Sequence, residues 1–298
     1  MHTENRTVPW AGLILVAVAA LLVLVPTWLR LADQLWHLEA YNHAPIILAI
    51  IGWIIWRQRG ALVRAWRNHV IQTWETALAV VLVVAAAVLY AIGRSQNLPL
   101  FESVGHWLFF VGGTLLLLGW PGVRALWFAY LLFLFAIPVP GFLIMAATGS
   151  LKALISNAVE QGLYALGYPV ARSGVVLSIG QYQLLVADAC SGLNSLYSLS
   201  ALGLVYVYLA AYPERWRNGW LLAAILPVAV IANFIRVLAL VLVTYHFGDA
   251  AGQGFVHDFA GFFVFGVALL VLFLVDLLLG WIARRRRATV APLQEAMA

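Results

Sequence analysis

One stretch sets the class of this protein: "WLLAAILPVAVIANFIRVLALVLV", residues 220–243. Its 24 residues are uncharged except for Arg236. A helix of about 20 apolar residues crosses the roughly 30 Å hydrocarbon core of a bilayer. The stretch therefore predicts a transmembrane helix, which we place at residues 218–243.

The composition extends this prediction to the whole chain. Hydrophobic residues make up 64% of it and charged residues 10%, whereas a soluble domain carries about 25% charged residues. The 13 tryptophans fit a protein whose aromatic side chains anchor at membrane–water interfaces. A single cysteine excludes an internal disulfide framework and any site with several cysteine ligands.

Eight apolar runs are candidate transmembrane helices, so we expect an all-α polytopic integral membrane protein, folded as one domain over residues 1–298. No small-residue cleavage site follows the first run, which we therefore interpret as a retained span. The runs are residues 10–27, 44–56, 76–93, 104–120, 122–139, 190–211, 218–243 and 258–282.

Basic residues predict the orientation of these spans. If the spans alternate in direction, most of the 17 lysines and arginines lie on one side of the membrane, including those in residues 57–67, 212–217 and 284–287. The positive-inside rule makes that side cytoplasmic, with both termini inside. The net charge of +5 is then a topology signal, and we expect no nucleic-acid partner.

The same alternation places residues 140–189 outside. Residues 149–168 have apolar positions at helical spacing and predict an amphipathic helix lying in the interface. Residues 169–189 contain glycine breaks and β-branched pairs, which predict a short hairpin. The hairpin would deliver the chain to Cys190, at the outer end of the sixth span.

Three side chains converge on this outer level. Arg236 is costly inside a membrane and usually faces a cavity or a partner. It lies sixteen residues beyond Trp220, or roughly 24 Å outward along a helix, and Asn233 shares its face. His257 opens the eighth span on the same outer side as Cys190.

The chemistry of these side chains is complementary. A cysteine at a helix start is favoured as the thiolate, a histidine can move its proton, and an arginine can hold an oxyanion. A Cys190–His257–Arg236 site would suit acyl transfer. No metal or other cofactor is expected.

Structural roles remain open for each of these residues. Cys190 could be a small packing residue, His257 an interfacial anchor, and Arg236 one half of an ion pair with an outer aspartate such as Asp188 or Asp258. His246, at the outer end of the seventh span, competes with His257 as the base. Further residues that could line the same pocket or support it are His43, Ser191 and Asn194. Asp276 is interpreted as a polar group that packs helices near the cytoplasmic side.

Five segments carry a resemblance to a known family: "FAIPVPGFL" (135–143), "GYPVARSGVVLSIGQYQLLV" (167–186), "VADACSGLNSL" (186–196), "NFIR" (233–236) and "GFVHDFAG" (254–261). Over roughly residues 40–280 the chain resembles the exosortases, bacterial integral-membrane sorting enzymes. The segments "GRSQ" (93–96) and "QYQLLVADACSGLNSL" (181–196) are most similar to the exosortase B subtype.

The resemblance implies that Cys190 is the nucleophile, with Arg236 and His257 as its catalytic partners. It implies an enzyme of the bacterial inner membrane whose active site faces the periplasm. Its substrates would be exported proteins with a C-terminal tail made of a Pro-Glu-Pro-type (PEP-CTERM) motif, a hydrophobic helix and a basic cluster. Cleavage near the motif could be followed by transfer to an acceptor, and genes of this family accompany exopolysaccharide systems.

Three other function classes compete with a thiol protease. A transporter or flippase of polysaccharide precursors would use Arg236 to bind phosphate, although no internal repeat supports it. A structural partner of an export complex would tolerate loss of Arg236 and of His257. A metal-dependent hydrolase would need clustered histidine and carboxylate ligands on one side, which the sequence does not show.

Overall fold

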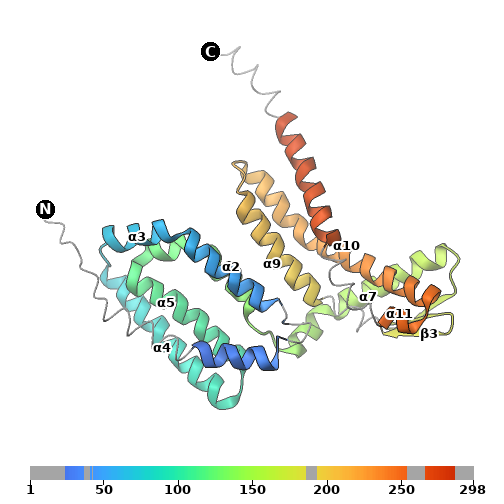
Figure 1. The fold of residues 1–298 in the computed structure, drawn as a ribbon, viewed down its shortest axis with the longest axis horizontal. Helices are drawn as coiled ribbons and strands as arrows, with labels where there is room; N and C mark the ends of the chain where they lie inside the picture. Colours follow the sequence, from blue (N-terminus) through green and yellow to red (C-terminus); the bar gives the residue numbers. More distant parts are fainter. Residues whose placement is uncertain (1–23, 37–40, 42, 186–192, 254–265, 286–298) are drawn as a thin grey trace, which may run out of the picture. The chain divides into compact units, whose positions relative to one another are not determined.

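The computed structural model describes residues 24–36, 41, 43–185, 193–253 and 266–285, and the side chains of 142–148 and 193–196 are outside this description. The chain divides into two compact units, Met1–Pro140 and Gly141–Ala298. Each unit is described by itself (Figure 1).

Unit 1 is helical. Residues 24–34 form a helix, and six further elements follow it. Helices α2 and α3 are bent by 53° where they meet at Gln58. The elements are α2 (Ala44–Arg57), α3 (Arg59–Asn68), α4 (Thr73–Gln96), α5 (Pro99–Ala125), α6 (Trp127–Phe133) and the 3-10 helix η1 (Leu134–Ala136).

Helices α4 and α5 form an antiparallel hairpin that packs through small residues. A Cβ placed on Gly105 would lie 2.9 Å from the carbonyl oxygen of Ala86, and one on Gly112 would lie 3.0 Å from the Cβ of Leu82. Small residues let the backbones of membrane helices approach closely, which favours their association where lipid removes the hydrophobic driving force. The buried small residues recur every seven positions: Ala79, Ala86 and Gly93 in α4, and Gly105, Gly112 and Gly119 in α5.

A buried carboxylate ties each end of this hairpin. At one end Glu102 of α5 is fully buried, pairs with Arg30, and accepts a hydrogen bond from Thr27 at 3.2 Å. Both partners belong to the helix of residues 24–34. A carboxylate removed from water needs such partners to stay charged, so the pair holds the N-terminal helix to the hairpin.

At the other end the carboxylate is Glu75, in the first turn of α4. It accepts hydrogen bonds from the backbone N–H of Gln72 at 2.7 Å and of Trp120 at 2.8 Å, and from the His69 ring at 2.9 Å. The Trp120 amide is available because Gly119, with φ of +63°, breaks the helical path of α5. Glu75 therefore joins the α3–α4 turn to the kink in α5.

Unit 2 combines membrane-type helices with a small sheet. Strands β1, β2 and β3 form an antiparallel sheet in that order, with Val170 opposite Ile179 and Val176 opposite Leu185. The elements are α7 (Gly141–Ala165), β1 (Val170–Ser173), β2 (Val176–Ile179), β3 (Tyr182–Leu185), α9 (Leu193–Ala210), α10 (Arg215–Phe247), α11 (Asp249–Gln253) and the helix Gly266–Arg285.

The predicted class is confirmed: the chain is a mostly helical membrane protein. Within the described residues four helices are long and apolar enough to cross a membrane, or five if the bent α2–α3 pair is one span. The four are α4, α5, α10 and the helix Gly266–Arg285, and they match the predicted spans 76–93, 104–120, 218–243 and 258–282. Eight spans are not confirmed, and most of the predicted span 10–27 lies outside the described residues.

Two segments differ from the sequence prediction. The predicted span 122–139 is a shorter apolar helix, Trp127–Ala136, because α5 continues past Pro121 to Ala125 and prolines at 138 and 140 follow. The predicted hairpin of residues 169–189 is instead a three-stranded sheet. Its two turns contain Gly174 and Gly180, which have φ of +63° and +56° and so adopt a conformation that favours glycine.

Candidate active site

Helix α10 organises unit 2. Its 33 residues extend about 50 Å, well beyond the roughly 30 Å of a hydrocarbon core. It ends at Gly248, which has φ of +88°. One face is buried along most of its length, through Leu221, Ile225, Val228, Ala229, Ala232, Asn233, Arg236, Val237, Leu240, Val241 and Thr244.

A carboxylate holds the N-terminal end of α10 to its neighbours. Asp276, in the helix Gly266–Arg285, accepts hydrogen bonds from the hydroxyl groups of Tyr206 at 2.6 Å and Tyr212 at 2.5 Å. Arg217 of α10 donates to the other carboxylate oxygen from Nη2 at 2.6 Å and from Nε at 3.0 Å. We call these four residues the carboxylate clamp.

The clamp is compact and well shielded. The guanidinium carbon of Arg217 lies 3.3 Å from the ring centroid of Tyr212, so the cation covers the aromatic face. Burial, followed by the hydrogen bond to Asp276, raises the pKa of Tyr212. Its hydroxyl therefore stays protonated near neutral pH and remains a donor to Asp276.

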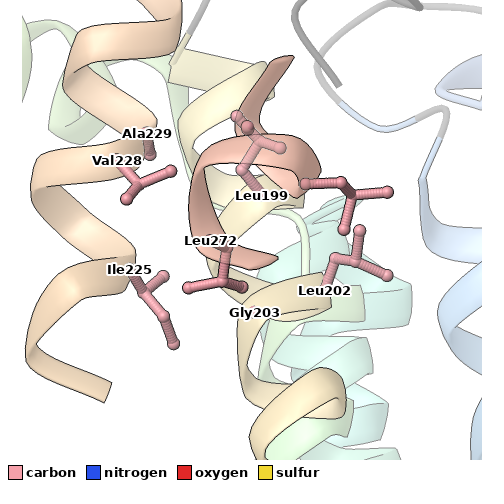
Figure 2. Close-up of a pocket in the computed structure, with 9 residues that line it drawn as sticks. Leu199, Leu202, Gly203, Ile225, Val228, Ala229 and Leu272 are labelled. Atoms are coloured by element: carbon pink, nitrogen blue, oxygen red, sulfur yellow. The ribbon is translucent and has the colours of Figure 1, made fainter. Parts of the chain in front are cut away.

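Next along α10, the helices α9, α10 and Gly266–Arg285 leave a small apolar hollow that opens to the outside. Figure 2 shows Ile225, Val228 and Ala229 of α10 facing Leu199 and Gly203 of α9. The third wall is the helix Gly266–Arg285, through Ala268, Leu269 and Leu272. All the residues that line the hollow are apolar, so no polar side chain faces it.

Beyond the hollow the buried face of α10 turns polar. Asn233 is 2% exposed and Arg236 is 3% exposed. They lie between two apolar clusters: Leu221 to Ala232 pack with α9 and the helix Gly266–Arg285, whereas Val237 and Val241 pack with α7 and the sheet. A buried guanidinium at such a junction usually serves a partner or a cavity.

The spacing along α10 separates Arg236 from the clamp by about one hydrocarbon thickness. The 19 residues from Arg217 to Arg236 correspond to about 28 Å, close to the thickness of a hydrocarbon core. One residue later, Val237 packs with Leu177 and Ile179 of β2. Because a sheet with open edges does not occur in lipid, this part of α10 lies outside the hydrocarbon. This arrangement supports the predicted interfacial level of Arg236, at the end of the span opposite the clamp.

The structure places only some of the predicted site residues. Arg236 and Asn233 lie together on α10, as their spacing predicts. Asn194 is the second residue of α9, and its side chain is outside the description. Cys190, Ser191 and His257 lie outside the described residues, as do the two aspartates considered as partners of Arg236, Asp188 and Asp258.

His43 belongs to unit 1. Its Nε2 lies 3.1 Å from the carbonyl oxygen of Phe135. Phe135 is in η1, three residues before Pro138. The Tyr41 hydroxyl donates to the Val139 carbonyl at 2.9 Å, so Tyr41 and His43 both bind the backbone of residues 135–139. Burial lowers the pKa of His43, which makes the ring neutral at pH 7.

His246, the alternative base, is exposed at the C-terminal end of α10. Its Nε2 lies 3.3 Å from the hydroxyl of Tyr168, and its ring meets the rings of Tyr168 and Tyr245 edge-on. It is ten residues, or about 15 Å, further along the helix than Arg236.

The clamp is the feature that the sequence did not reveal. Asp276 was recognised as a helix-packing group, but Arg217 was read only as a topology signal and the two tyrosines were not singled out. An aspartate within an apolar run requires donors. Tyrosines and an arginine in "YVYLAAYPERWR" (206–217) supply them.

Within the described residues, no group of three or more His, Cys, Asp or Glu side chains could hold a metal ion. A protein-family model, transmembrane exosortase (Exosortase_EpsH), matches residues 28–274. The chain belongs to the exosortase family. The match extends over both units and most of the chain.

Membership implies a multi-pass membrane protein and a protein-sorting protease or transpeptidase. Comparison with curated proteins and with solved structures gives no match.

Proposed function

We propose that this exosortase is a cysteine protease or transpeptidase that cleaves the C-terminal sorting tail of exported proteins. Cleavage would occur at the periplasmic face of the bacterial inner membrane, with both termini of the enzyme in the cytoplasm. The substrate tail would be of the PEP-CTERM type, linked to exopolysaccharide systems. Cys190, His257 and Arg236 would carry the reaction.

The proposed reaction is acyl transfer through a thioester. The Cys190 sulfur attacks the scissile carbonyl carbon while His257 takes the thiol proton. Arg236 stabilises the oxyanion, with Asn233 one turn away on the same face. The C–N bond then breaks, and the amine leaves with the proton from His257. Water, or the amine of an acceptor, releases the acyl group from Cys190.

The position of Arg236 is the observation that carries the proposal. Its guanidinium is buried on the inner face of α10, about 28 Å from the clamp and next to the sheet-covered end of the helix. A substrate whose hydrophobic helix crosses the membrane beside α10, with its basic end inside, would present the preceding peptide bond at this level. Strand β3 ends at Leu185, five residues before Cys190, on the same sheet that covers α10.

The position of His246 favours His257 as the base. His246 lies about 15 Å further along the rigid helix than Arg236, and its ring is engaged by Tyr168. One carbonyl group cannot easily contact both Arg236 and His246 across this separation. His257 comes from a different segment, so the distance along α10 does not restrict it.

The test is the mass of an exported reporter protein that carries such a tail, expressed together with the enzyme. Wild type should remove the tail, whereas Cys190→Ser and Cys190→Ala should leave it intact while reaching the membrane in normal amounts. Arg236→Gln and His257→Ala should be at least about 100-fold slower, and His246→Ala should cleave normally. Cleavage by Cys190→Ala would overturn the proposal and return attention to a transporter or a structural partner.

A further inference from the structure

We infer that the carboxylate clamp is a positioning element for catalysis: through Asp276 it sets the relative position of the three chain segments that bring Cys190, Arg236 and His257 to the site. The inference rests on the function proposed above. It assigns a role to residues at the opposite membrane boundary, about 28 Å from Arg236.

The clamp joins all three helices associated with the proposed catalytic residues. Tyr206 belongs to α9, which begins three residues after Cys190. Arg217 belongs to α10, which carries Arg236. Asp276 belongs to the helix Gly266–Arg285, which begins nine residues after His257. One carboxylate thus binds a donor from each of the other two helices and a fourth residue, Tyr212, from the turn between them.

The apolar packing of these helices does not by itself fix their relative position. A small open hollow interrupts the apolar contacts between α9, α10 and the helix Gly266–Arg285. Apolar contacts are also non-directional, so they restrict the sliding of one helix along another only weakly. The four side-chain hydrogen bonds to Asp276 are charge-assisted, three of them are 2.5–2.6 Å long, and together they fix both distance and direction.

Small displacements matter for the reaction. A misplacement of about 1 Å far from the reacting atoms can lower a rate about 100-fold. If the clamp is weakened, the helices should shift relative to one another while the fold persists, because the apolar cluster that includes Leu221, Ile225 and Leu272 remains. The loss should then appear in catalysis more than in stability.

Unit 1 offers a matched control. Glu102 is also a fully buried carboxylate paired with an arginine, but it fastens the N-terminal helix to the α4–α5 hairpin. Glu102→Gln and Asp276→Asn remove the same charge from similarly buried positions. A purely structural role for Asp276 predicts that the two variants behave alike.

The experiment uses the full-length enzyme in proteoliposomes with a purified tail-bearing substrate. Two readouts are followed. The first is kcat and KM for cleavage. The second is the rate at which a thiol reagent labels the enzyme without substrate, measured as a function of pH. The chain has one cysteine, so the label reports on Cys190 alone. Asp276→Asn should lower kcat at least about tenfold with KM within about twofold of wild type.

Labelling should respond in parallel. Displacement of Arg236 and His257 from the thiol removes the charges that favour the thiolate, so labelling of Asp276→Asn at pH 7 should fall about threefold and its pH profile should move upward. Tyr206→Phe and Tyr212→Phe, which keep the Arg217–Asp276 ion pair, should show smaller changes in the same direction. Asp276→Glu should recover part of the loss. If Asp276→Asn does not accumulate, the two tyrosine variants decide the outcome.

Wild-type kcat and labelling in Asp276→Asn would overturn the inference, as would equal effects of Glu102→Gln on both readouts. In the tyrosine variants, unchanged kcat and labelling would also overturn it. Failure of the proposed function looks different, because Cys190→Ala would then still cleave the substrate. An inactive Cys190→Ala beside a fully active Asp276→Asn would leave the function intact and reject only the positioning role.

Discussion

Two groups of helices are held together in different ways. One is the α4–α5 hairpin of unit 1, and the other is α9, α10 and the helix Gly266–Arg285 of unit 2. In the hairpin, glycines bring two backbones so close that an added Cβ on Gly105 would meet a carbonyl oxygen at 2.9 Å. In unit 2, α9, α10 and the helix Gly266–Arg285 leave a hollow between them, and Asp276 binds donors from the other two helices. Close backbone contact along its length distinguishes the first arrangement, although buried carboxylates also fasten its two ends. A single carboxylate shared by three helices distinguishes the second.

The difference matters because lipid provides no hydrophobic driving force between apolar helices. A region held by close backbone packing has little freedom to rearrange, which suits a scaffold. A region held by polar contacts around free space depends on a few side chains for its geometry, and this is the region that carries Arg236. The following variants test the comparison, beginning with the largest expected effect.

Breaking a buried ion pair should have the largest effect on unfolding. Arg30→Ala would leave the Glu102 carboxylate fully buried without its cation, which should lower the free energy of unfolding by about 3–5 kcal/mol. Arg172→Ala breaks a partly exposed pair with Glu160 in unit 2 and should cost less than about 1 kcal/mol. Reversible unfolding in mixed micelles measures both values. Equal losses would mean that Glu102 keeps other partners or becomes accessible to water.

The close approach of α4 and α5 predicts a second contrast within one helix. A methyl group on Gly105 would collide with the backbone of Ala86 and Tyr90, whereas one on Gly113 meets nothing within 4 Å. Gly105→Ala should therefore lose about 2–3 kcal/mol. Gly113→Ala should be neutral or slightly stabilising, because alanine favours a helix over glycine by up to about 1 kcal/mol. If both variants behave alike, the helices are not as close as described.

These contrasts also show which features the sequence could predict. Spans such as 76–93 and 218–243 were predictable because length and hydropathy are local properties of the chain. The interfacial level of Arg236 was predicted from a count of residues at a fixed rise and stays a prediction, supported by the sheet that belongs to the same apolar cluster as Val237. The hairpin was predicted with one strand too few, although breaks near both Gly174 and Gly180 were visible in the sequence.

The clamp and the hollow depend instead on which helices are neighbours. Tyr206 and Asp276 are 70 residues apart, and no periodicity links them. The span 122–139 was misjudged for a related reason. A turn was expected between the runs 104–120 and 122–139, but the helix resumes after the kink at Gly119, with Pro121 near the start of the continuing segment, and extends to Ala125.

The same substitution in the two regions gives a third, smaller contrast. Ala86→Val adds two methyl groups where α4 faces Gly105 and should cost about 1–2 kcal/mol through overpacking. Ala268→Val adds them at the wall of the hollow and should change stability by less than about 1 kcal/mol, since the new methyl groups gain contacts. Both alanines are buried in helices, so the lower helix propensity of valine affects the two variants equally. An equal loss at both sites would mean that the hollow is closed in the membrane.

The smallest expected effect concerns pH and is confined to unit 1. Burial holds the pKa of His43 below its ordinary value of 6.5, so the unfolded chain binds a proton more readily than the folded protein. The free energy of unfolding therefore keeps its full value above pH 6.5, where the ring is neutral in both states. It decreases as the pH falls below 6.5, because the unfolded chain gains a proton that the folded protein resists. The melting temperature of wild type should therefore fall between pH 7.5 and pH 5.5 by more than that of His43→Gln. Because the ring binds the carbonyl of Phe135, the loss should appear as earlier proteolysis near residues 135–139. An identical pH dependence in the two proteins would show that the ring takes up its proton without leaving this contact.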